Sequence, residues 1–560
     1  MTPEKTAHHA ESDTRAAVNE RVSPGGAEAG ERRNIAKRAG IVATGTLASR
    51  LLGLGRDQTI AALFPRGVTD AFFVAFTIPN VLRQLLGEGA VQNAVLPVLV
   101  KIREQRGEAE ARRFFGAVRG VSLVALVATT ALGIGFAPAL VSLFAGGYAS
   151  VPGELERTVL LTRWVFPYIL CMGTAALGAA ALNTHQRFVA TSFAPGLLNV
   201  SFIALALVLP PVLGAHGYEP GLALAAGALL GGVLQVVAQW PSLKAIGYFG
   251  APSFALRDPG VREVGRRMAP LLVGMGVYYI DVVLARRFLS ELGLGAQSYF
   301  SWAMRLCDFP QGIFVMALQA AALPSLARLA ARGDRDELGR TFAFGMRLAL
   351  FVALPATALF VGLAEPLVVL LFQRGEFDHE AARQTAAALV AQGSGVWLVA
   401  AVRQLLAVYY AVGDTRTPVY VAATDLVAFI VLALVLRGPL GHVGVGWAVS
   451  GSSAVQAGLL WLLLLKKVPS VAGQGIAGSV LRVAGASSAA VIAGRCVAFA
   501  LDRGPQAGVV ARALPGLFGA AAFGVTFLAV AFLLKSPELL TLREEIRRKL
   551  MRRRGGGTPS

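Results

Sequence analysis

Four arginines lie inside stretches of sequence that are otherwise apolar. Arg50 and Arg56 fall in the run from about residue 39 to residue 64, Arg83 falls in the next run, and Arg305 falls in a later one. A charged side chain at the depth of a bilayer costs about 3 kcal/mol or more, so it persists only where it faces a polar cavity or a partner. Guanidinium groups bind phosphate oxygens through paired hydrogen bonds. We therefore predict that these arginines line a cavity for an anionic, phosphate-bearing substrate.

An acidic residue accompanies two of these arginines and allows a second interpretation. Asp57 lies seven residues after Arg50, which places it on the same helix face, and Asp308 lies three residues after Arg305. A carboxylate can neutralise a buried arginine simply to make its burial tolerable. Internal neutralisation therefore stays open as an alternative, and it applies best to Arg305 and Asp308.

The composition indicates a membrane protein. Of the 560 residues, 55% are hydrophobic and only 15% are charged, and the apolar residues form long runs separated by short polar breaks. A helix of about 20 apolar residues spans a bilayer, and by this rule we count about fourteen spanning runs. The predicted fold class is an all-α polytopic membrane protein. Because this number of crossings is even, both termini are expected on the same side of the membrane.

Basic residues are distributed unevenly among the connecting loops. The net charge is +19, and most of the excess lies after the second, sixth, eighth and twelfth runs and in the C-terminal tail. Cytoplasmic loops carry such an excess of lysine and arginine, so we predict that both termini are cytoplasmic. Contact with anionic lipid headgroups is a secondary expectation. No aromatic platform or folded basic module accompanies the charge, so nucleic acid is not an expected partner.

The sequence also contains an internal repeat. Residues 90–97 (AVQNAVLP) match residues 317–324 (ALQAAALP) at an offset of 227 residues. We predict two six-helix lobes in parallel orientation, with a substrate site at their interface. Arg50, Arg56 and Arg83 have no basic counterparts in the second lobe, and an anionic substrate would require such an asymmetry. The alternative is an old duplication that is retained only for packing.

These patterns divide the chain into five predicted regions. The first residues are polar and contain no apolar run, which is typical of a disordered segment. The predicted regions are a disordered cytoplasmic extension (1–34), the first lobe (35–250), the second lobe with an amphipathic linker (251–467), two further membrane helices (468–540) and a basic cytoplasmic tail (541–560).

Five short motifs are specific enough to carry a family resemblance. They are SRLLGLGRD (49–57), TDAFFVAF (69–76), IPNVLR (78–83), GEGA (87–90) and RLCDFP (305–310). Together they resemble the MurJ/MviN family of lipid II flippases, within the multidrug/oligosaccharidyl-lipid/polysaccharide exporter superfamily. The resemblance implies a fourteen-helix fold with two lobes in a V, a groove for a lipid tail along the last two helices, and a bacterial inner-membrane location.

The resemblance also implies roles for individual residues. The arginines that would hold the substrate's pyrophosphate in the cavity are Arg50, Arg56, Arg83 and Arg305. The positions implied to be sensitive for the cavity or for gating are Ser49, Asp57, Asp70, Glu88, Ser298 and Asp308. The chain departs from its relatives at Gln84 and Thr77, where some of them carry a basic residue, so cavity contacts there are expected to be weaker.

A cation site is implied in the second lobe. Asp281 and Asp425 resemble carboxylates that bind sodium in some family members, but Val421 stands where a polar partner is expected. The alternative is that both aspartates pair with arginines, namely Arg286, Arg287 or Arg403. We expect no catalytic residue, no bound metal at another site and no cofactor. The membrane potential, Na⁺ or H⁺ is the expected source of energy.

The function implied by the resemblance is that of a lipid II flippase. Such a protein moves undecaprenyl-pyrophosphate-linked disaccharide-pentapeptide, the peptidoglycan precursor, from the inner to the outer leaflet by alternating access. The expected partners are lipid II and membrane lipids, with other cell-wall synthesis proteins as candidates, and we expect a monomer.

Four alternative functions remain open. A flippase for another polyprenyl-linked glycan would differ only in the headgroup that it binds. A drug or cation antiporter would need a cavity rich in carboxylates, and a membrane enzyme would need a metal-binding carboxylate pair or a nucleophile with its base. The three cysteines and six histidines share no such motif. A noncatalytic scaffold would not need arginines at bilayer depth.

Overall fold

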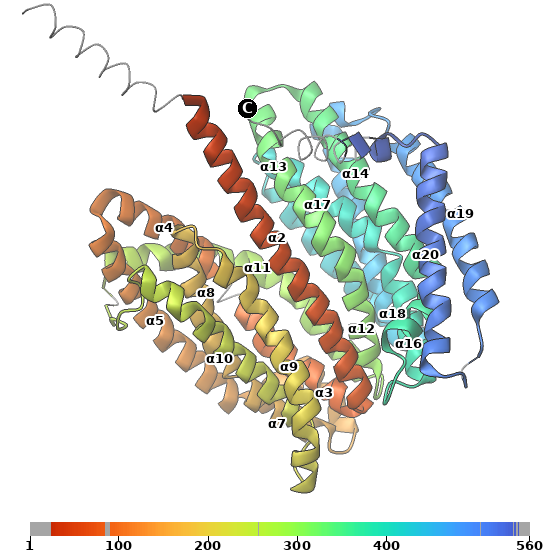
Figure 1. The fold of residues 1–560 in the computed structure, drawn as a ribbon, viewed down its shortest axis with the longest axis horizontal. Coiled ribbons are helices and arrows are strands. Elements are labelled where there is room, and N and C mark those ends of the chain that lie inside the picture. The colour runs from red at the N-terminus through yellow and green to blue at the C-terminus, as the bar shows by residue number, and fades with distance from the viewer. Residues whose placement is uncertain are drawn as a thin grey trace, which may run out of the picture.

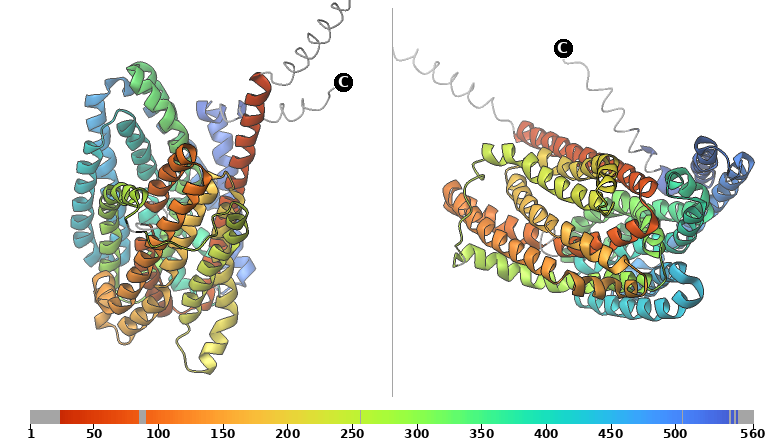
Figure 2. Two further views of the ribbon diagram at one scale, coloured as in Figure 1. Left: turned by 90° about the vertical axis from the view of Figure 1, so that its left-hand side faces the viewer. Right: turned by 90° about the horizontal axis from the view of Figure 1, so that it is seen from below.

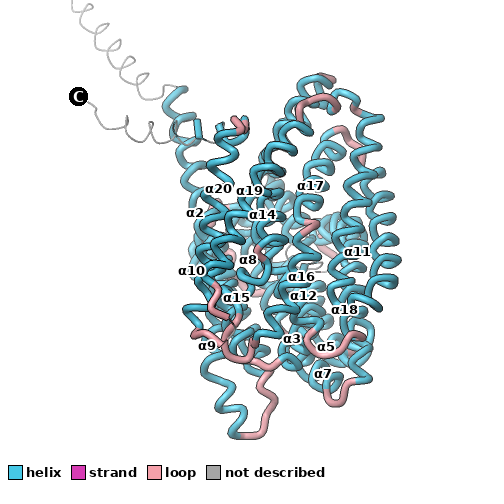
Figure 3. The backbone as a smooth tube through the Cα atoms, turned by 90° about the vertical axis from the view of Figure 1, so that its right-hand side faces the viewer, coloured by secondary structure: helices cyan, strands magenta, loops and turns pink. Residues whose placement is uncertain are grey.

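The computed structural model describes residues 24–84, 90–255, 257–504, 506–540, 543–544 and 547. The regular structure of these residues is entirely helical, and none of them lies in a strand. Figure 3 shows long helices joined by short loops. Inside a bilayer no water is present to satisfy backbone groups, and a helix satisfies them within a single segment. The predicted all-α class is confirmed.

The first lobe comes from the N-terminal half of the chain. Its helices are α2 (Pro24–Leu63), α3 (Arg66–Arg83), α4 (Ala90–Arg106), α5 (Glu108–Gly135), α6 (Ala137–Ala145), the 3-10 helix η3 (Gly146–Ser150), α7 (Glu154–Val165), α8 (Tyr168–Thr184), α9 (Val189–Ala215) and α10 (Leu222–Ala245). In this lobe α2 packs along α9, and α9 packs along α10.

The second lobe follows, together with two further helices. Its helices are α11 (Pro259–Ser290), α12 (Ala296–Pro310), the π-helix η4 (Gln311–Val315), α13 (Met316–Arg332), α14 (Arg335–Gly362), α15 (Ala364–Phe372), α16 (His379–Gly393), α17 (Val396–Ala411) and α18 (Arg416–Lys467). The short 3-10 helix η5 (Pro469–Val471) leads into α19 (Ile476–Leu501) and α20 (Val509–Leu533), which pack against each other.

The two lobes form a V. In Figure 1 the helices α3 to α10 lie on the left, α12 to α18 lie on the right, and α19 and α20 flank the second lobe. The lobes diverge towards the end where α2 begins and meet at the opposite end. Helix α11 joins them, since it contacts α4 and α6 of the first lobe and α18 of the second. Figure 2 shows that α2 begins and α20 ends at the same end of the molecule.

The internal repeat is visible in the helix boundaries. Helices α5 and α14 begin at residues 108 and 335 and end at residues 135 and 362, so both bounds differ by 227. The short helices that follow, α6 and α15, run from 137 to 145 and from 364 to 372 and keep the same offset. The repeat that aligns the sequence therefore also aligns the two lobes helix by helix.

Nine helical segments within the described residues are long and apolar enough to cross a membrane. One of them, Arg416–Lys467, consists of two helices joined at Gly441, whose φ of 57° lies in the left-handed region that favours glycine. Segments that carry several charges, such as α2 with its arginines, do not meet this hydropathy criterion. The predicted number of fourteen crossings therefore stays a prediction.

The buried core is divided in a way that suits two moving lobes. One cluster belongs to the first lobe and includes Phe115 and Tyr248, and another belongs to the second lobe and includes Phe342 and Tyr409. The largest cluster crosses between the lobes where they meet: the rings of Phe73 on α3 and Trp302 on α12 lie 4.7 Å apart, edge to face. Contact between the lobes is thus concentrated at one end.

The structure corrects one predicted boundary. Helix α2 begins at Pro24, so residues 24–34 are helical, whereas we expected disorder as far as residue 34. The segment contains three glycines, but its alanines, glutamates and arginines at residues 27–29 and 31–33 are strong helix formers and favour an outward extension of the helix. Residues 1–23 and most of the predicted basic tail, 541–560, lie outside the described residues.

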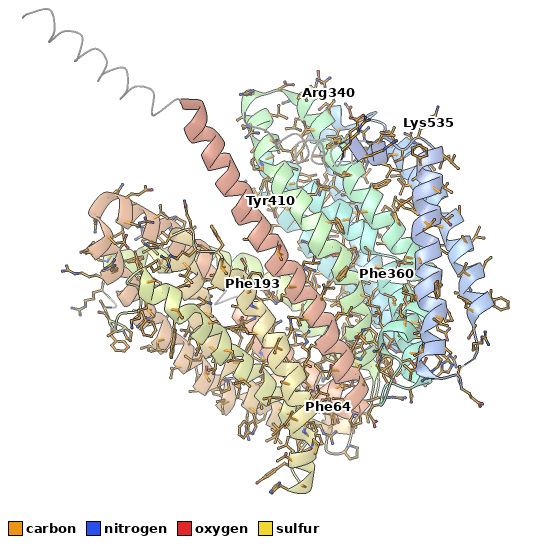
Figure 4. The ribbon with its side chains drawn as sticks, viewed as in Figure 1. Phe64, Phe193, Arg340, Phe360, Tyr410 and Lys535 are labelled. Carbon is orange, nitrogen blue, oxygen red and sulfur yellow. The ribbon has the colours of Figure 1, made fainter. Side chains whose placement is uncertain are left out.

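The two ends of the molecule differ in the basic residues that they carry. Figure 4 places Arg340 and Lys535 at the end where α2 begins, and Phe64 at the end where the lobes meet. The α13–α14 connection, which holds Arg332 and Arg335, also lies at the first end. The basic loops that predicted the orientation therefore gather at the end where the V is open.

Candidate substrate cavity and lobe seal

A cavity of about 1230 Å³ lies between the lobes. Its walls come from α2, α3, α8, α9 and α10 of the first lobe and from α12, η4, α14, α15 and α17 of the second. The charged residues that line it are Arg50, Arg56, Asp57, Arg83, Arg305, Asp308 and Arg403. With five arginines against two aspartates, the cavity carries an excess of positive charge.

Arg50 reaches from the first lobe to the second. Its guanidinium lies against Gly312 in η4, and a methyl group at Gly312 would overlap it. Arg50 makes no ion pair or hydrogen bond with another described side chain, although its charge interacts with that of Asp308. Its neighbour Ser49 also lines the cavity, and the Ser49 carbonyl accepts a hydrogen bond from Asn199 Nδ2 at 2.9 Å. The N–H donors of the Arg50 guanidinium are therefore available to bind a ligand.

Arg56, Asp57 and Arg305 form a charge network across the cavity. Arg56 donates from Nε and Nη2 to Asp57 Oδ1 at 2.9 and 2.7 Å, and its guanidinium lies 5.5 Å from the ring centre of Phe202. The other oxygen of Asp57 lies 3.6 Å from Arg305 Nε on α12. The Asp57 side chain is only 6% exposed, whereas that of Arg305 is 45% exposed. Asp57 therefore orients two arginines and leaves Arg305 open to the cavity.

This network differs from the pairings that the sequence suggested. Asp57 contacts its neighbour Arg56 and not Arg50, and the ion-pair partner of Arg305 is Asp57 and not Asp308. Spacing along one helix places side chains on a common face. It does not include a partner from another helix, and here α2 and α12 lie on opposite walls of the cavity.

Arg403 is a cavity residue that sequence reasoning did not assign to the site. It lies on α17 and lines the cavity, and its Nε is buried without a hydrogen-bond partner among the described residues. The signal that identifies it is the one that identified the others, an arginine inside the apolar run 396–411. Arg83, which was predicted, lines the cavity with its Nε donating to Asn80 Oδ1 at 2.9 Å.

The rest of the lining supplies uncharged hydrogen-bonding groups. Amide side chains come from both lobes: Asn80, Gln84, Asn183, Asn199, Gln235, Gln239 and Gln311. Amides both donate and accept hydrogen bonds, as sugar hydroxyls and peptide groups do. The cavity can therefore hold a large polar headgroup in addition to an anion.

Asp70 and Ser298 do not line the cavity; they seal it where the lobes meet. Asp70 on α3 is fully buried and accepts hydrogen bonds from the backbone N–H groups of Gly295 and Ser298 at 2.6 and 2.8 Å, and from the Ser298 hydroxyl. Gly295 is the N-cap of α12 and has no side chain to cap it. A carboxylate from the first lobe thus caps a helix of the second, at the positive end of its dipole.

Further contacts close the same end. Arg66 forms an ion pair with Asp378, which precedes α16, and the N–H of Glu376 donates to the Ala62 carbonyl at 2.9 Å. The Gly147 N–H donates to Ser290 Oγ at 3.1 Å. Each of these contacts joins the first lobe to the second, so all of them must break if the lobes are to separate here.

The candidate cation residues lie outside the cavity. Asp281 on α11 and Asp425 on α18 are near enough for their charges to interact, and each has a buried oxygen without a partner among the described residues. Asp425 also accepts a hydrogen bond from Ser452. Neither aspartate forms an ion pair with Arg286, Arg287 or Arg403 in the part of the chain that is described. Glu88, the remaining predicted residue, lies outside the described residues.

Comparisons with known proteins identify the family of this chain. The model of the family described as "Lipid II flippase MurJ" matches residues 60–519. The lipid II flippase MurJ of Burkholderia cenocepacia is 34% identical over 75% of this chain and 82% of its own length. A probable lipid II flippase MurJ of Rhizobium meliloti is 31% identical over 92% of this chain and 97% of its own length.

Solved structures share the fold. A lipid II flippase MurJ in an inward closed conformation has a TM-score of 0.70 at 21% identity and covers 88% of this chain and 99% of its own. An inward-facing transporter of the multidrug resistance MATE family, from the MOP superfamily, has a TM-score of 0.63 at 16% identity and covers 76% of this chain and 95% of its own. On the match of the family model and of the curated relatives, this chain belongs to the MurJ family of lipid II flippases.

Proposed function

We propose that this protein is a lipid II flippase that carries the undecaprenyl-pyrophosphate-linked peptidoglycan precursor from the inner to the outer leaflet. The observation that carries this proposal is the cavity between the lobes, where five arginines outnumber two aspartates. A pyrophosphate offers several anionic oxygens to such a site, and guanidinium groups bind them bidentately. The amides that line the same cavity suit the sugar and peptide parts of the headgroup.

The individual arginines would act in different ways. Arg50 and Arg403 have no ion-pair partner among the described residues, so they would bind the anion without first giving up a carboxylate. Arg56 and Arg305 share Asp57. The anion would compete with Asp57 for them, and the carboxylate would hold both guanidinium groups in place between cycles.

The proposed mechanism is alternating access. The headgroup enters while the lobes are sealed by Asp70 and the contacts around it, and the polyprenyl tail stays in the lipid. Rocking of the lobes would then break the Asp70 cap on α12 and open the opposite side. Clusters that lie within a single lobe, together with contact between the lobes that is concentrated at the seal, support a rigid-body motion of this kind.

The orientation in the membrane is part of the proposal. The basic connections lie at the end where the V is open. Lysine and arginine are retained on the cytoplasmic side, so the cavity would open to the cytoplasm, with both termini there and the seal on the outer side.

We further propose that the membrane potential or an ion gradient resets the cycle. Moving one charge through 100 mV supplies about 2.3 kcal/mol. Na⁺ or H⁺ bound between Asp281 and Asp425 would serve, because each has a buried oxygen without a partner. We also propose that one chain suffices, since the cavity is built from a single chain.

A drug or cation antiporter is not supported by this site. A cationic drug would have to enter a cavity with an excess of arginine, and like charges repel.

The test uses cells whose growth depends on this protein. Replacing Arg50 and Arg56 together by alanine should abolish growth, because two of the five guanidinium groups are lost, while Arg340→Ala on the exposed surface should leave growth normal at equal expression. Acute depletion of the wild-type protein should remove lipid II from the outer leaflet and accumulate it inside. Normal growth of the double variant would contradict the proposed role of the arginines. Unchanged outer lipid II after depletion would point to another polyprenyl-linked glycan.

A further inference from the structure

A second pocket lies on the outside of the second lobe, away from the substrate cavity. Its volume is about 600 Å³, and it is formed where α14, α15 and α16 meet α19 and α20. Figure 1 shows that the loop between α19 and α20 lies at the end of the molecule where the lobes meet. The charged or ionisable residues that line the pocket are Glu365, His379, Arg383, Arg495, Asp502 and Arg512.

Two arginines of this pocket have no partner in the described part of the protein. Arg495 on α19 and Arg512 on α20 form no ion pair and no side-chain hydrogen bond with the described residues, and Arg512 Nε is buried. The third arginine, Arg383, lies 3.7 Å from Glu380 of its own helix. A buried guanidinium nitrogen without an acceptor is costly, and this cost indicates that a ligand supplies the acceptor.

The carboxylates of the pocket do not neutralise these arginines. Asp502 Oδ1 accepts a hydrogen bond from the backbone N–H of Gly504, within the loop between α19 and α20. Glu365 is exposed on the first turn of α15. Neither forms an ion pair with a described residue, so both remain available as hydrogen-bond acceptors beside the free guanidinium groups.

The surface beside the pocket is apolar. Phe499 lines the pocket and is 86% exposed, and Ile492 and Val510 on the same two helices are 65% and 75% exposed. Arg495 lies six residues before the end of α19, and Arg512 lies three residues after the start of α20. At about 1.5 Å per residue, both lie within roughly 10 Å of the helix ends, which is the depth of lipid headgroups and not of the bilayer centre.

We propose that this pocket binds the headgroup of an anionic glycerophospholipid of the phosphatidylglycerol type. Arg495 and Arg512 bind the phosphate diester, the carboxylates of Glu365 and Asp502 accept hydrogen bonds from the glycerol hydroxyls, and the acyl chains lie along the exposed faces of α19 and α20. A choline headgroup offers no donor to these carboxylates. This site does not depend on the proposed flippase activity.

A simpler explanation is that both arginines only reach toward the interface and water, as such side chains commonly do. That explanation accounts for exposed Arg495 but not for the buried Nε of Arg512, or for a concave pocket that draws residues from five helices. The pocket also borders the seal: it includes His379, and the preceding residue, Asp378, pairs with Arg66 of the first lobe.

The experiment measures lipid binding to the purified full-length protein. Native mass spectrometry would count phosphatidylglycerol retained by the wild type, by Arg495→Gln/Arg512→Gln and by the control Arg482→Gln. Arg482 is also an arginine of α19 and is partly exposed, but it donates to the Gly478 carbonyl of its own helix and lies outside the pocket. We expect about hundredfold weaker retention by the double variant, since two charge-assisted contacts are lost and each is worth roughly tenfold, and no change in the control.

Three further arms identify the ligand. Phosphatidylcholine should be retained less than phosphatidylglycerol by the wild type, and inorganic phosphate at millimolar concentration should not displace the lipid. Ala387→Trp, which fills the pocket without removing a charge, should lower retention as the double variant does. Wild-type retention by a folded double variant would overturn the proposal, as would equal retention of both lipids. Displacement by inorganic phosphate would assign the pocket to the free ion.

Discussion

At the scale of single residues, the site depends on how the arginine side chains are positioned. Arg50 lies against Gly312, the second residue of a π-helix, and only a residue without a side chain leaves room for its guanidinium there. Arg56 and Arg305 are positioned by Asp57. Arg403 Nε is buried and has no hydrogen-bond acceptor among the described residues. Short π-helical turns are frequent at functional sites, and this one packs directly against the guanidinium of Arg50.

Gly312→Ala should therefore lower flipping while leaving the fold intact. The new methyl group would push the end of the flexible Arg50 side chain away from its position, and the loss of one charge-assisted contact lowers substrate affinity by roughly tenfold. Binding of lipid II to the purified variant measures this loss. Gly458→Ala is the matched control, because a methyl group at that helical glycine meets no neighbour. An unchanged affinity for Gly312→Ala would show that Arg50 needs no fixed position.

At the scale of elements, the connections between helices are held by side chains that cap them. Asp414 lies in the loop between α17 and α18, where it accepts hydrogen bonds from the N–H groups of Arg416 and Thr417 at 3.1 and 3.0 Å. It also forms an ion pair with Lys467 at the far end of α18. One carboxylate thus joins the start of this long bent helix to its end.

Asp414→Asn should lower the thermal stability of the protein by an amount that does not vary between about pH 6 and pH 8. Burial acts to raise the pKa of Asp414, but hydrogen bonds from Lys467 and Thr417 outweigh it and hold the pKa well below its ordinary value. A depressed pKa means that the stabilisation is complete above the ordinary pKa and is lost only as the pH falls through the lowered one.

The expected loss for Asp414→Asn is about 1 kcal/mol, as for other capping residues. Melting curves at the two pH values, compared with those of the wild type, measure it. A deficit that grows or shrinks within this range would mean that another titrating group governs the loop.

At the scale of the whole molecule, the function requires that the two lobes separate where they now meet. The seal joins residues that are 143 or more positions apart in the chain, and Asp70 is at its centre with three hydrogen bonds to the start of α12. The seal also includes apolar contacts, because the largest buried cluster crosses between the lobes there, while other clusters lie within a single lobe. Opening the seal would therefore expose the crossing cluster and leave the clusters within each lobe buried.

Asp70→Asn should shift the protein towards the state in which this seal is open. An asparagine keeps the size of the side chain but loses the negative charge that stabilises the N-terminus of α12, an effect of about 1 kcal/mol or more. The measurement is disulfide formation between Leu63→Cys and Glu376→Cys in a protein without its native cysteines. Residues 63 and 376 are exposed and lie on the two sides of the seal, where the Glu376 N–H bonds to the Ala62 carbonyl.

The cross-link should form efficiently in the parent and less in Asp70→Asn. Asp334→Asn supplies the control, because Asp334 caps α14 within the second lobe and takes no part in the seal. Equal cross-linking in the parent and in Asp70→Asn would show that the cap on α12 does not hold the lobes together. Ser298→Ala should have a smaller effect, since Asp70 would keep both backbone donors.

Much of this protein could be predicted before its structure was known, because a bilayer imposes strong local rules. The length of apolar runs predicts the helices, an offset of 227 residues reveals the repeat, and arginines inside apolar runs predicted the cavity residues Arg50, Arg56, Arg83 and Arg305. The same rule applied to the run 396–411 would have identified Arg403. The inferences about the helices and the arginines need only residues that are near one another in the chain, and the repeat needs only a comparison of the sequence with itself.

Only the tertiary structure determined which side chains pair with each other. The sequence suggested Asp308 for Arg305, whereas the fold supplies Asp57 from another helix, and nothing in the sequence indicates that Asp70 caps α12. The second pocket likewise exists only where five helices meet. The physical reason is that helix periodicity determines which face a side chain occupies, while its partner depends on which helix the packing of the lobes places opposite that face.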